Sequence, residues 1–217
     1  MRTFGFPEFL FILEAAKWTL ALSAIAFVGG AILGLAIALM RTSESTWARG
    51  ISTTFIQIFQ GTPLLLQLFL VFFGAPVLGL DINPWVAAGV ALILNSAAFL
   101  GEIWRGCIQA VPRSQWEAAE CLALTRLERM RRVILPQALR IATPPTVGFL
   151  VQIIKNTSIA SLVVGYAELS YNAKVLNNST FQPFLYFGCA VVLYFILCYP
   201  LSRWSRALER KLNAARG

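Results

Sequence analysis

The sequence predicts an all-α integral membrane protein with about five transmembrane helices and a short cytoplasmic helix pair between helices three and four. Hydrophobic residues make up 58% of the 217 residues, charged residues only 13%, and the mean hydropathy is +0.69. A soluble domain cannot bury that much apolar surface, so lipid is the expected solvent. Five apolar runs approach the roughly 20 residues that a membrane-spanning helix needs.

The five expected spans lie in one transmembrane domain that covers residues 1–217. They fall at residues 18–40, 51–73, 85–104, 141–164 and 184–201. None alternates polar and apolar residues as a membrane strand does, so each is expected to be a helix. The first run exceeds the core of a signal peptide and has no small-residue cleavage pattern after it, so we expect it to be retained.

The basic residues are distributed asymmetrically about these spans. With the N-terminus outside, 14 of the 18 lysines and arginines fall in inner segments, and the outer segments hold only Arg2, Lys17 and Lys174. This strong positive-inside bias predicts an N-terminus outside and a C-terminus inside. It also accounts for the net charge of +8, so nucleic acid is not an expected partner.

The cysteines and the missing histidines argue against a metal site. Cys107, Cys121, Cys189 and Cys198 have no metal-ligand or paired spacing, and the sequence contains no histidine. On the predicted topology Cys107 and Cys121 face the cytoplasm, where a structural disulfide is disfavoured. We expect all four to be small apolar packing residues.

The first span carries a stripe of small residues, Ala26, Gly30, Gly34 and Ala38, four residues apart. Such a stripe lets a second helix backbone approach closely. We expect that helix to belong to the same chain; the alternative is a seam with a second subunit.

The second span is polar along one face, where Gln57, Gln60 and Gln67 recur at helical spacing. Buried amides need partners or water, so this face should point to the protein interior or to a polar path. Gly61-Thr62-Pro63 interrupts the helix, because a proline lacks an amide proton and clashes with the preceding turn. The resulting kink fits a gate and a static bend equally well.

Two polar residues share a face of the third span, Asn95 and Glu102. Glu102 lies one turn before Arg105, which predicts an ion pair at the headgroup boundary rather than a proton relay. Asn95 lies deeper and is the better candidate for lining a path. In the fourth span Gln152 and Lys155 share a face in the same way.

Residues 105–140 leave the membrane on the inner side. Pro112 can open a helix there, and Ser114 with Glu117 fits a capping box. A second amphipathic segment, residues 126–133, is expected to end before Pro136.

This segment resembles the cytoplasmic EAA loop of membrane subunits in ATP-binding-cassette (ABC) importers. The family pattern is Glu-Ala-Ala, three residues, Gly, nine residues, Ile, one residue, Leu-Pro. Here it is matched by Glu117-Ala118-Ala119, Val133 and Leu135-Pro136, with Ala123 at the glycine position. Without that glycine, the turn must be made otherwise or the two helices must meet at a different angle.

Three further segments resemble the polar amino-acid permeases of this family. Residues 60–67 are similar to an Arg-Gly-Thr-Pro-Leu pattern, with Gln60 in place of the arginine. Residues 95–106 match the third-helix pattern, and residues 155–161 are similar to a Lys-Asp/Asn-Thr-Ser-Leu segment. The resemblance covers about residues 10–210.

The resemblance implies a permease subunit of an ATP-driven importer for polar amino acids or related small zwitterions, in the bacterial cytoplasmic (inner) membrane. Its implied partners are two cytoplasmic ABC ATPase subunits, a second permease (identical or homologous) and an extracytoplasmic substrate-binding protein, with lipid around the spans. The implied residues for coupling to the ATPases are Glu117, Ala118, Ala119, Ala123, Arg126, Leu135 and Pro136.

The chain should not be an enzyme itself. It lacks a Gly-x-x-x-x-Gly-Lys-Ser/Thr phosphate loop, so no cofactor is expected on this chain, and ATP and Mg belong to the partner ATPases. For the substrate path the candidates are Gln57, Gln67, Asn95, Gln152 and Lys155. Amides can bind both charged ends of an amino acid, whereas Lys155 either attracts its carboxylate or snorkels outward.

Three other functional classes fit less well. A secondary transporter, the main alternative, usually shows repeated halves, and none is visible. An ion channel would need a filter-like glycine loop, and a membrane enzyme would need a catalytic cluster. Dependence of uptake on an ATPase and a binding protein separates the importer from all three.

Overall fold

The structure is a computed structural model that describes residues 5–214, so two of the basic residues counted above, Arg2 and Arg216, lie outside it. The described residues are all-helical and contain no strand. In chain order the elements are α1 (Phe6–Arg41), α2 (Thr46–Gly61), α3 (Leu64–Val77), α4 (Pro84–Gln109), α5 (Arg113–Cys121), α6 (Arg126–Glu128), the π-helix η1 (Arg129–Ile134), α7 (Leu135–Val164), α8 (Leu169–Thr180) and α9 (Pro183–Ala214).

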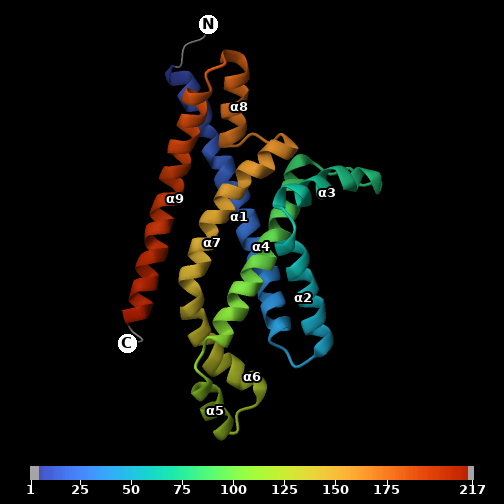
Figure 1. Cartoon of the computed structure of the whole chain (residues 1–217), viewed down its shortest axis with the longest axis vertical. Helices are drawn as coiled ribbons and strands as arrows, with labels where there is room; N and C mark the ends of the chain where they lie inside the picture. The colour runs from blue at the N-terminus through green and yellow to red at the C-terminus, as the bar shows by residue number, and fades with distance from the viewer. Residues whose placement is uncertain (1–4, 215–217) are drawn as a thin grey trace.

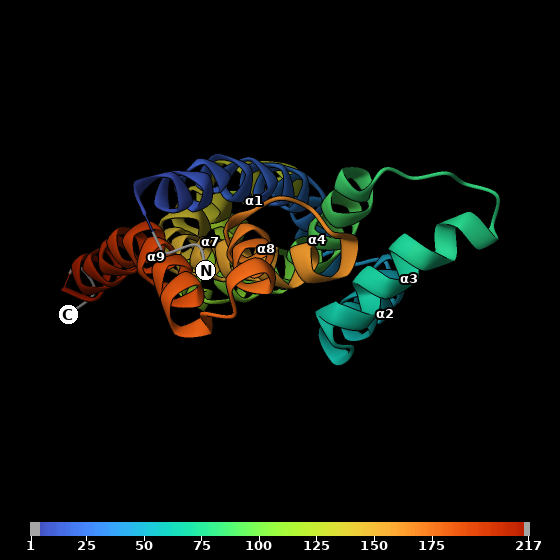
Figure 2. The ribbon, with the colours of Figure 1, turned by 90° about the horizontal axis from the view of Figure 1, so that it is seen from above.

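Four helices are each long and apolar enough to cross a membrane: α1, α4, α9 and the helix that contains α7. They run along the long axis of the molecule, with α8 at the end that holds the N-terminus and α5 and α6 at the end that holds the C-terminus (Figure 1). The helices α2 and α3 are together long and apolar enough for a fifth crossing, but they are bent by 102° at the break between them, which is the geometry of a broken span or of a re-entrant loop. Seen from above, α3 projects away from the other spans (Figure 2).

The predicted second span, residues 51–73, is therefore not one helix. Its 16-residue first half, α2, is about 24 Å long and cannot cross a hydrocarbon core of about 30 Å alone. Thr62 takes an extended conformation, with φ −119° and ψ 144°, as expected of a residue before a proline. Pro63 stays extended and α3 restarts at Leu64 in a new direction.

The small-residue stripe of α1 packs on α4 of the same chain. A Cβ atom on Gly30 would lie 2.5 Å from the Cβ of Ser96, and one on Gly34 would lie 3.1 Å from the backbone oxygen of Ala97. Only glycine permits so close an approach. The partner helix belongs to the same chain, as expected, so the alternative of a seam with a second subunit is not needed to explain the stripe.

The helix after the cytoplasmic loop is longer than predicted. We expected the segment to end before Pro136, but α6, η1 and α7 form one continuous helix, Arg126–Val164. Pro136 has no amide hydrogen and would crowd the carbonyl one turn earlier in a regular α-helix. The wide π turn just before it, in which the Leu135 amide donates to the Met130 oxygen, relieves this conflict without breaking the helix.

An unpredicted buried carboxylate joins the spans at the end of the molecule where α8 lies (Figure 1). The side chain of Glu168 is 0% exposed. It accepts hydrogen bonds from the hydroxyls of Thr19 (3.3 Å), Ser161 (2.6 Å) and Tyr194 and from two backbone amides in the first turn of α8 (2.7 and 3.1 Å). Glu168 thus caps α8 and ties it to α1, α7 and α9.

Candidate functional site: the cytoplasmic loop and the polar residues of the spans

The short helix α5 presents two of the three EAA residues outward. Glu117 and Ala118 are exposed, whereas Ala119 is 2% exposed and packs inward. Within residues 5–214, the ion-pair partner of Glu117 is Arg113 one turn earlier, at 3.0 Å, on an open surface. The same outer face carries Cys121 and Leu122, and we call these four exposed residues the docking face: Glu117, Ala118, Cys121 and Leu122.

The end of α5 shows how the turn is made without the family's glycine. Ala123 adopts a left-handed conformation with φ 53°, as a glycine would. Its amide donates to the Glu120 oxygen at 2.9 Å, and the Leu124 amide donates to the Ala119 oxygen at 3.3 Å, the two bonds of a Schellman motif. The sharp turn is therefore kept and the alanine bears the strain, so the helices need not meet at another angle.

The predicted capping box at Ser114 is wrong. The helix α5 starts at Arg113 behind Pro112, and no side chain caps it. A capping box instead opens α6: the Thr125 oxygen accepts from the Glu128 amide at 3.4 Å, and the Thr125 amide donates to the Glu128 carboxylate at 3.1 Å. The pKa of Glu128 is lowered, mainly by the hydrogen bond from the Thr125 hydroxyl and to a smaller extent by the hydrogen bond from the Thr125 amide.

The loop also exposes large apolar side chains that sequence reasoning passed over. Leu122 is 73% exposed and Leu127 is 76% exposed, although both lie in a polar cytoplasmic segment. The only signal in the sequence was that both leucines lie in a segment rich in arginine and glutamate. Exposed apolar groups of this kind mark a surface that meets a protein partner or the membrane.

The remaining predicted coupling residues face other ways. Arg126 points back to the turn between α1 and α2, where it contacts the Thr42 carbonyl and the Glu44 carboxylate. Leu135 and Pro136 lie in the continuous helix, at the junction between the π turn and α7. They shape the helix that leaves the loop rather than the docking face.

The bend between α2 and α3 is held by two residues that we had assigned to the substrate path. Gln67 is 6% exposed and Asn95 4%. The Gln67 amide nitrogen donates to the carbonyls of Phe59 (2.8 Å) and Thr62 (3.0 Å), and its oxygen accepts from Asn95 at 3.0 Å. Gln67 thus satisfies carbonyls that the break at Gly61-Thr62-Pro63 leaves open, and Asn95 fastens the bend to α4.

The other path candidates are exposed in the single chain. Gln57 lies on α2, below the bend, and no longer shares a helix face with Gln67. Gln152 donates to Asn156 at 3.0 Å. Lys155 forms no ion pair within residues 5–214 and lines a groove of about 350 Å³ against α9. The structure therefore joins Gln67 with Asn95 by a hydrogen bond, whereas the side chains of Gln57, Gln152 and Lys155 remain exposed.

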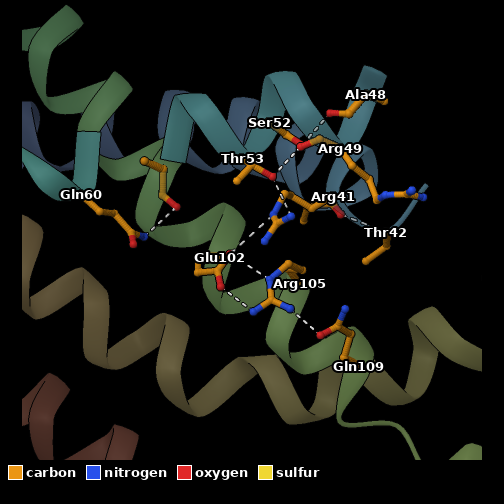
Figure 3. Close-up of polar contacts among 12 residues, drawn as sticks. Arg41, Thr42, Ala48, Arg49, Ser52, Thr53, Gln60, Glu102, Arg105 and Gln109 are labelled. Carbon is orange, nitrogen blue, oxygen red and sulfur yellow. Dashed lines mark hydrogen bonds and ion pairs between the residues drawn. The ribbon is translucent and has the colours of Figure 1, made fainter. Parts of the chain in front are cut away.

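A polar network lies at the inner ends of α1, α2 and α4 (Figure 3). The expected ion pair between Glu102 and Arg105 is present at 2.5 Å. Arg41 approaches the same carboxylate at 4.0 Å and donates to the Thr53 hydroxyl at 2.8 Å. The network therefore fastens the inner half of α2 to α1 and α4.

Comparison with known proteins identifies this arrangement. Residues 19–214 match the model of the family described as binding-protein-dependent transport system inner membrane component. The chain belongs to this family.

Curated relatives and a solved structure match this chain over most of its length. It is 33% identical over 204 residues to the "Probable amino-acid ABC transporter permease protein YckA" of Bacillus subtilis (strain 168), covering 94% of this chain and 90% of the relative. It is 35% identical over 197 residues to the L-cystine transport system permease protein TcyB of the same organism, covering 90% and 84%. A crystal structure of an amino acid ABC transporter with histidines superposes with a TM-score of 0.88 at 31% identity, covering 97% of this chain and 100% of the other.

The chain is therefore an ABC importer permease subunit, a multi-pass protein of the inner membrane. Subunits of this family form the membrane path and are normally not the ATPase. The loop between α4 and α7 is the segment that carries the family's EAA pattern.

Proposed function

We propose that this permease moves polar amino acids, or related small zwitterions, inward across the bacterial inner membrane. The named substrates of its relatives support this class: one is an amino-acid permease, one a cystine permease, and the superposed transporter is described with histidines. Substrate would arrive from an extracytoplasmic binding protein. A second permease, identical or homologous, would complete the path.

The docking face on α5 carries the proposal that two ABC ATPases drive this movement. Glu117 and Ala118 give a polar contact beside a small side chain, and Leu122 adds apolar surface that water would otherwise meet. ATP and Mg would bind the ATPase subunits and not this chain. Closure of the ATPases would move α5, and the turn at Ala123 would pass that displacement to the helix Arg126–Val164.

That helix is a suitable lever because it is continuous. Its 39 residues span about 58 Å and connect the loop directly to Gln152 and Lys155 in the membrane. A shift of its loop end would therefore reach the polar residues of α7 through one unbroken helix, past the π turn and the internal Pro144 and Pro145. We propose that Gln57, Gln152 and Lys155 line the path, while Gln67 and Asn95 shape it by holding the bend.

We propose an orientation with the N-terminus outside and the C-terminus inside, on the basis of the positive-inside bias of the sequence. The arginine-rich end that contains α5, α6 and the end of α9 then faces the cytoplasm and the ATPases (Figure 1). On α9 the basic residues Arg203, Arg206 and Arg210 follow the apolar span in one unbroken helix, at the level where anionic headgroups would lie.

The test is affinity purification of the permease with its partners in mild detergent, followed by uptake in proteoliposomes. We expect the wild type to retain the ATPases and to import a labelled amino acid only with internal ATP and external binding protein. Glu117→Arg should remain in the membrane but lose the ATPases or hydrolyse ATP without uptake.

A matched control is Glu209→Arg, which makes the same charge change at an exposed site on the α9 tail. This variant should keep both properties. Normal uptake by Glu117→Arg would refute the docking role. Uptake driven by an ion gradient in the absence of ATP would instead support a secondary transporter.

A further inference from the structure

The turn between α1 and α2 is a stiff unit. The Arg49 guanidinium reaches back from α2 and donates to the backbone oxygens of Ser43 (2.9 Å) and Glu44 (2.8 Å). The Ser45 side chain caps α2 by accepting from the Ala48 amide at 3.3 Å. These bonds fasten the turn to the first turns of α2, so a force on the turn acts on the whole helix.

Arg126 joins this turn to the cytoplasmic loop. One of its terminal nitrogens donates to the Thr42 oxygen at 2.8 Å, and the other lies 2.5 Å from the Glu44 carboxylate. The capping box at Thr125 holds Arg126 in the first turn of α6, just after the Ala123 turn. Among the polar contacts of residues 5–214, those of Arg126 connect the α6 end of the loop to α1 and α2.

We propose that Arg126 is a strut that carries motion of the cytoplasmic loop to α2, in addition to the direct route along α7. The inference rests on the proposed coupling role of the loop. Movement of α6 displaces the α1–α2 turn through Thr42 and Glu44, and the stiff turn passes it to α2. The upper end of α2 is the bend at Gly61-Thr62-Pro63, which Gln67 holds against α4.

Two helices would thus move together around the path. The direct route shifts α7 with Gln152 and Lys155, and the strut shifts α2 with Gln57 and the bend. The strut assigns Arg126 a positioning role inside the permease. A residue that bound the ATPase would instead point outward, as Glu117 does, whereas the Arg126 side chain is 40% exposed and bound to two groups of this chain.

Charge exchange tests the strut in the full complex. We expect Arg126→Glu and Glu44→Arg each to keep the ATPases bound and hydrolysing while uptake per ATP falls about two- to five-fold, as for loss of an exposed charge pair. The exchange Arg126→Glu with Glu44→Arg should recover at least half of the loss. The control Arg131→Glu makes the same change at an exposed arginine of η1 and should leave the ratio unchanged.

Each other outcome overturns the strut in a defined way. Wild-type uptake per ATP in Arg126→Glu, or an exchange variant no better than the single variants, removes the role. Loss of the ATPases from Arg126→Glu makes Arg126 a docking residue and leaves the proposed function standing. Retention of coupled ATPases by Glu117→Arg would refute the docking role of α5, on which the strut rests.

A cross-link distinguishes a strut from a latch. In a variant whose four native cysteines are serines, Glu44→Cys and Arg126→Cys are joined before the uptake assay by a bis-methanethiosulfonate linker, which forms one mixed disulfide with each thiol and replaces the length of the two original side chains. A strut keeps its length during the cycle, so coupled uptake should survive cross-linking. If cross-linking abolishes uptake and cleavage of the linker by a thiol reductant restores it, the contact must open in every cycle and the strut is refuted.

Discussion

The turn at Ala123 offers a sharp test of how the loop is built. An L-residue in the left-handed conformation costs about 1–2 kcal/mol, whereas glycine adopts it freely. Glycine loses about 0.5–1 kcal/mol more chain entropy on folding, so Ala123→Gly should stabilise the turn by about 0.5–1 kcal/mol. This corresponds to a roughly two- to five-fold smaller opening constant.

Amide hydrogen exchange of the loop measures that change directly. The amides of Leu122, Ala123 and Leu124 donate to carbonyls of α5, so they exchange only when the turn opens. We expect slower exchange of the peptide that covers α5 in Ala123→Gly and faster exchange in Ala123→Val, whose β-branch is a strong outlier at φ 53°. Faster exchange in the glycine variant would show that Ala123 is not strained and would refute the reasoning.

Three further predictions concern the membrane part. Gly30→Ala should lower the free energy of unfolding by about 1–3 kcal/mol, because its Cβ would lie 2.5 Å from a side-chain carbon of α4. The control Gly50→Ala, which has open space around it, should not lower it, and chemical unfolding compares the two variants. Glu168→Ala should lower the free energy of unfolding by more than about 3 kcal/mol, since the hydrogen bonds from three hydroxyls and two backbone amides are lost, and an unchanged unfolding midpoint would contradict this. Asn95→Leu should lower the free energy of unfolding by about 1–3 kcal/mol because it leaves the Gln67 oxygen unpaired. An unchanged free energy of unfolding would show that the hydrogen bond between Asn95 and Gln67 does not hold the bend.

Local sequence signals predicted the parts of the fold that depend on neighbouring residues. Apolar run length placed the helices, and the spacing of Glu102 and Arg105 predicted their ion pair. The stripe at Gly30 and Gly34 indicated a close helix contact, and its more ordinary interpretation within one chain was correct. Proline at position 63 predicted an interruption of the second span, though not its 102° angle.

The parts that could not be predicted depend on long-range contacts. Glu168 draws its partners from α1, α7, α8 and α9, and no spacing in the sequence reveals that they meet. The sequence predicted a kink at Gly61-Thr62-Pro63, but not that the bend turns Gln67 onto the broken end of α2 and brings it to Asn95. Pro136 predicted a helix end because proline disrupts a regular α-helix. The π turn that accommodates it could not be predicted, since no single residue encodes such a turn.

The most direct test of the docking face uses a native side chain. Cys121 lies on α5 between Glu117 and Ala118 on the helix surface and is exposed, whereas Cys107 and Cys198 are buried and Cys189 is partly buried. Maleimide labelling of Cys121 is compared in the permease alone and in the complex with its ATPases. The account predicts rapid labelling alone and strong protection in the complex. Equal labelling rates in the two samples would show that the ATPases do not cover this face, and the coupling account would fail.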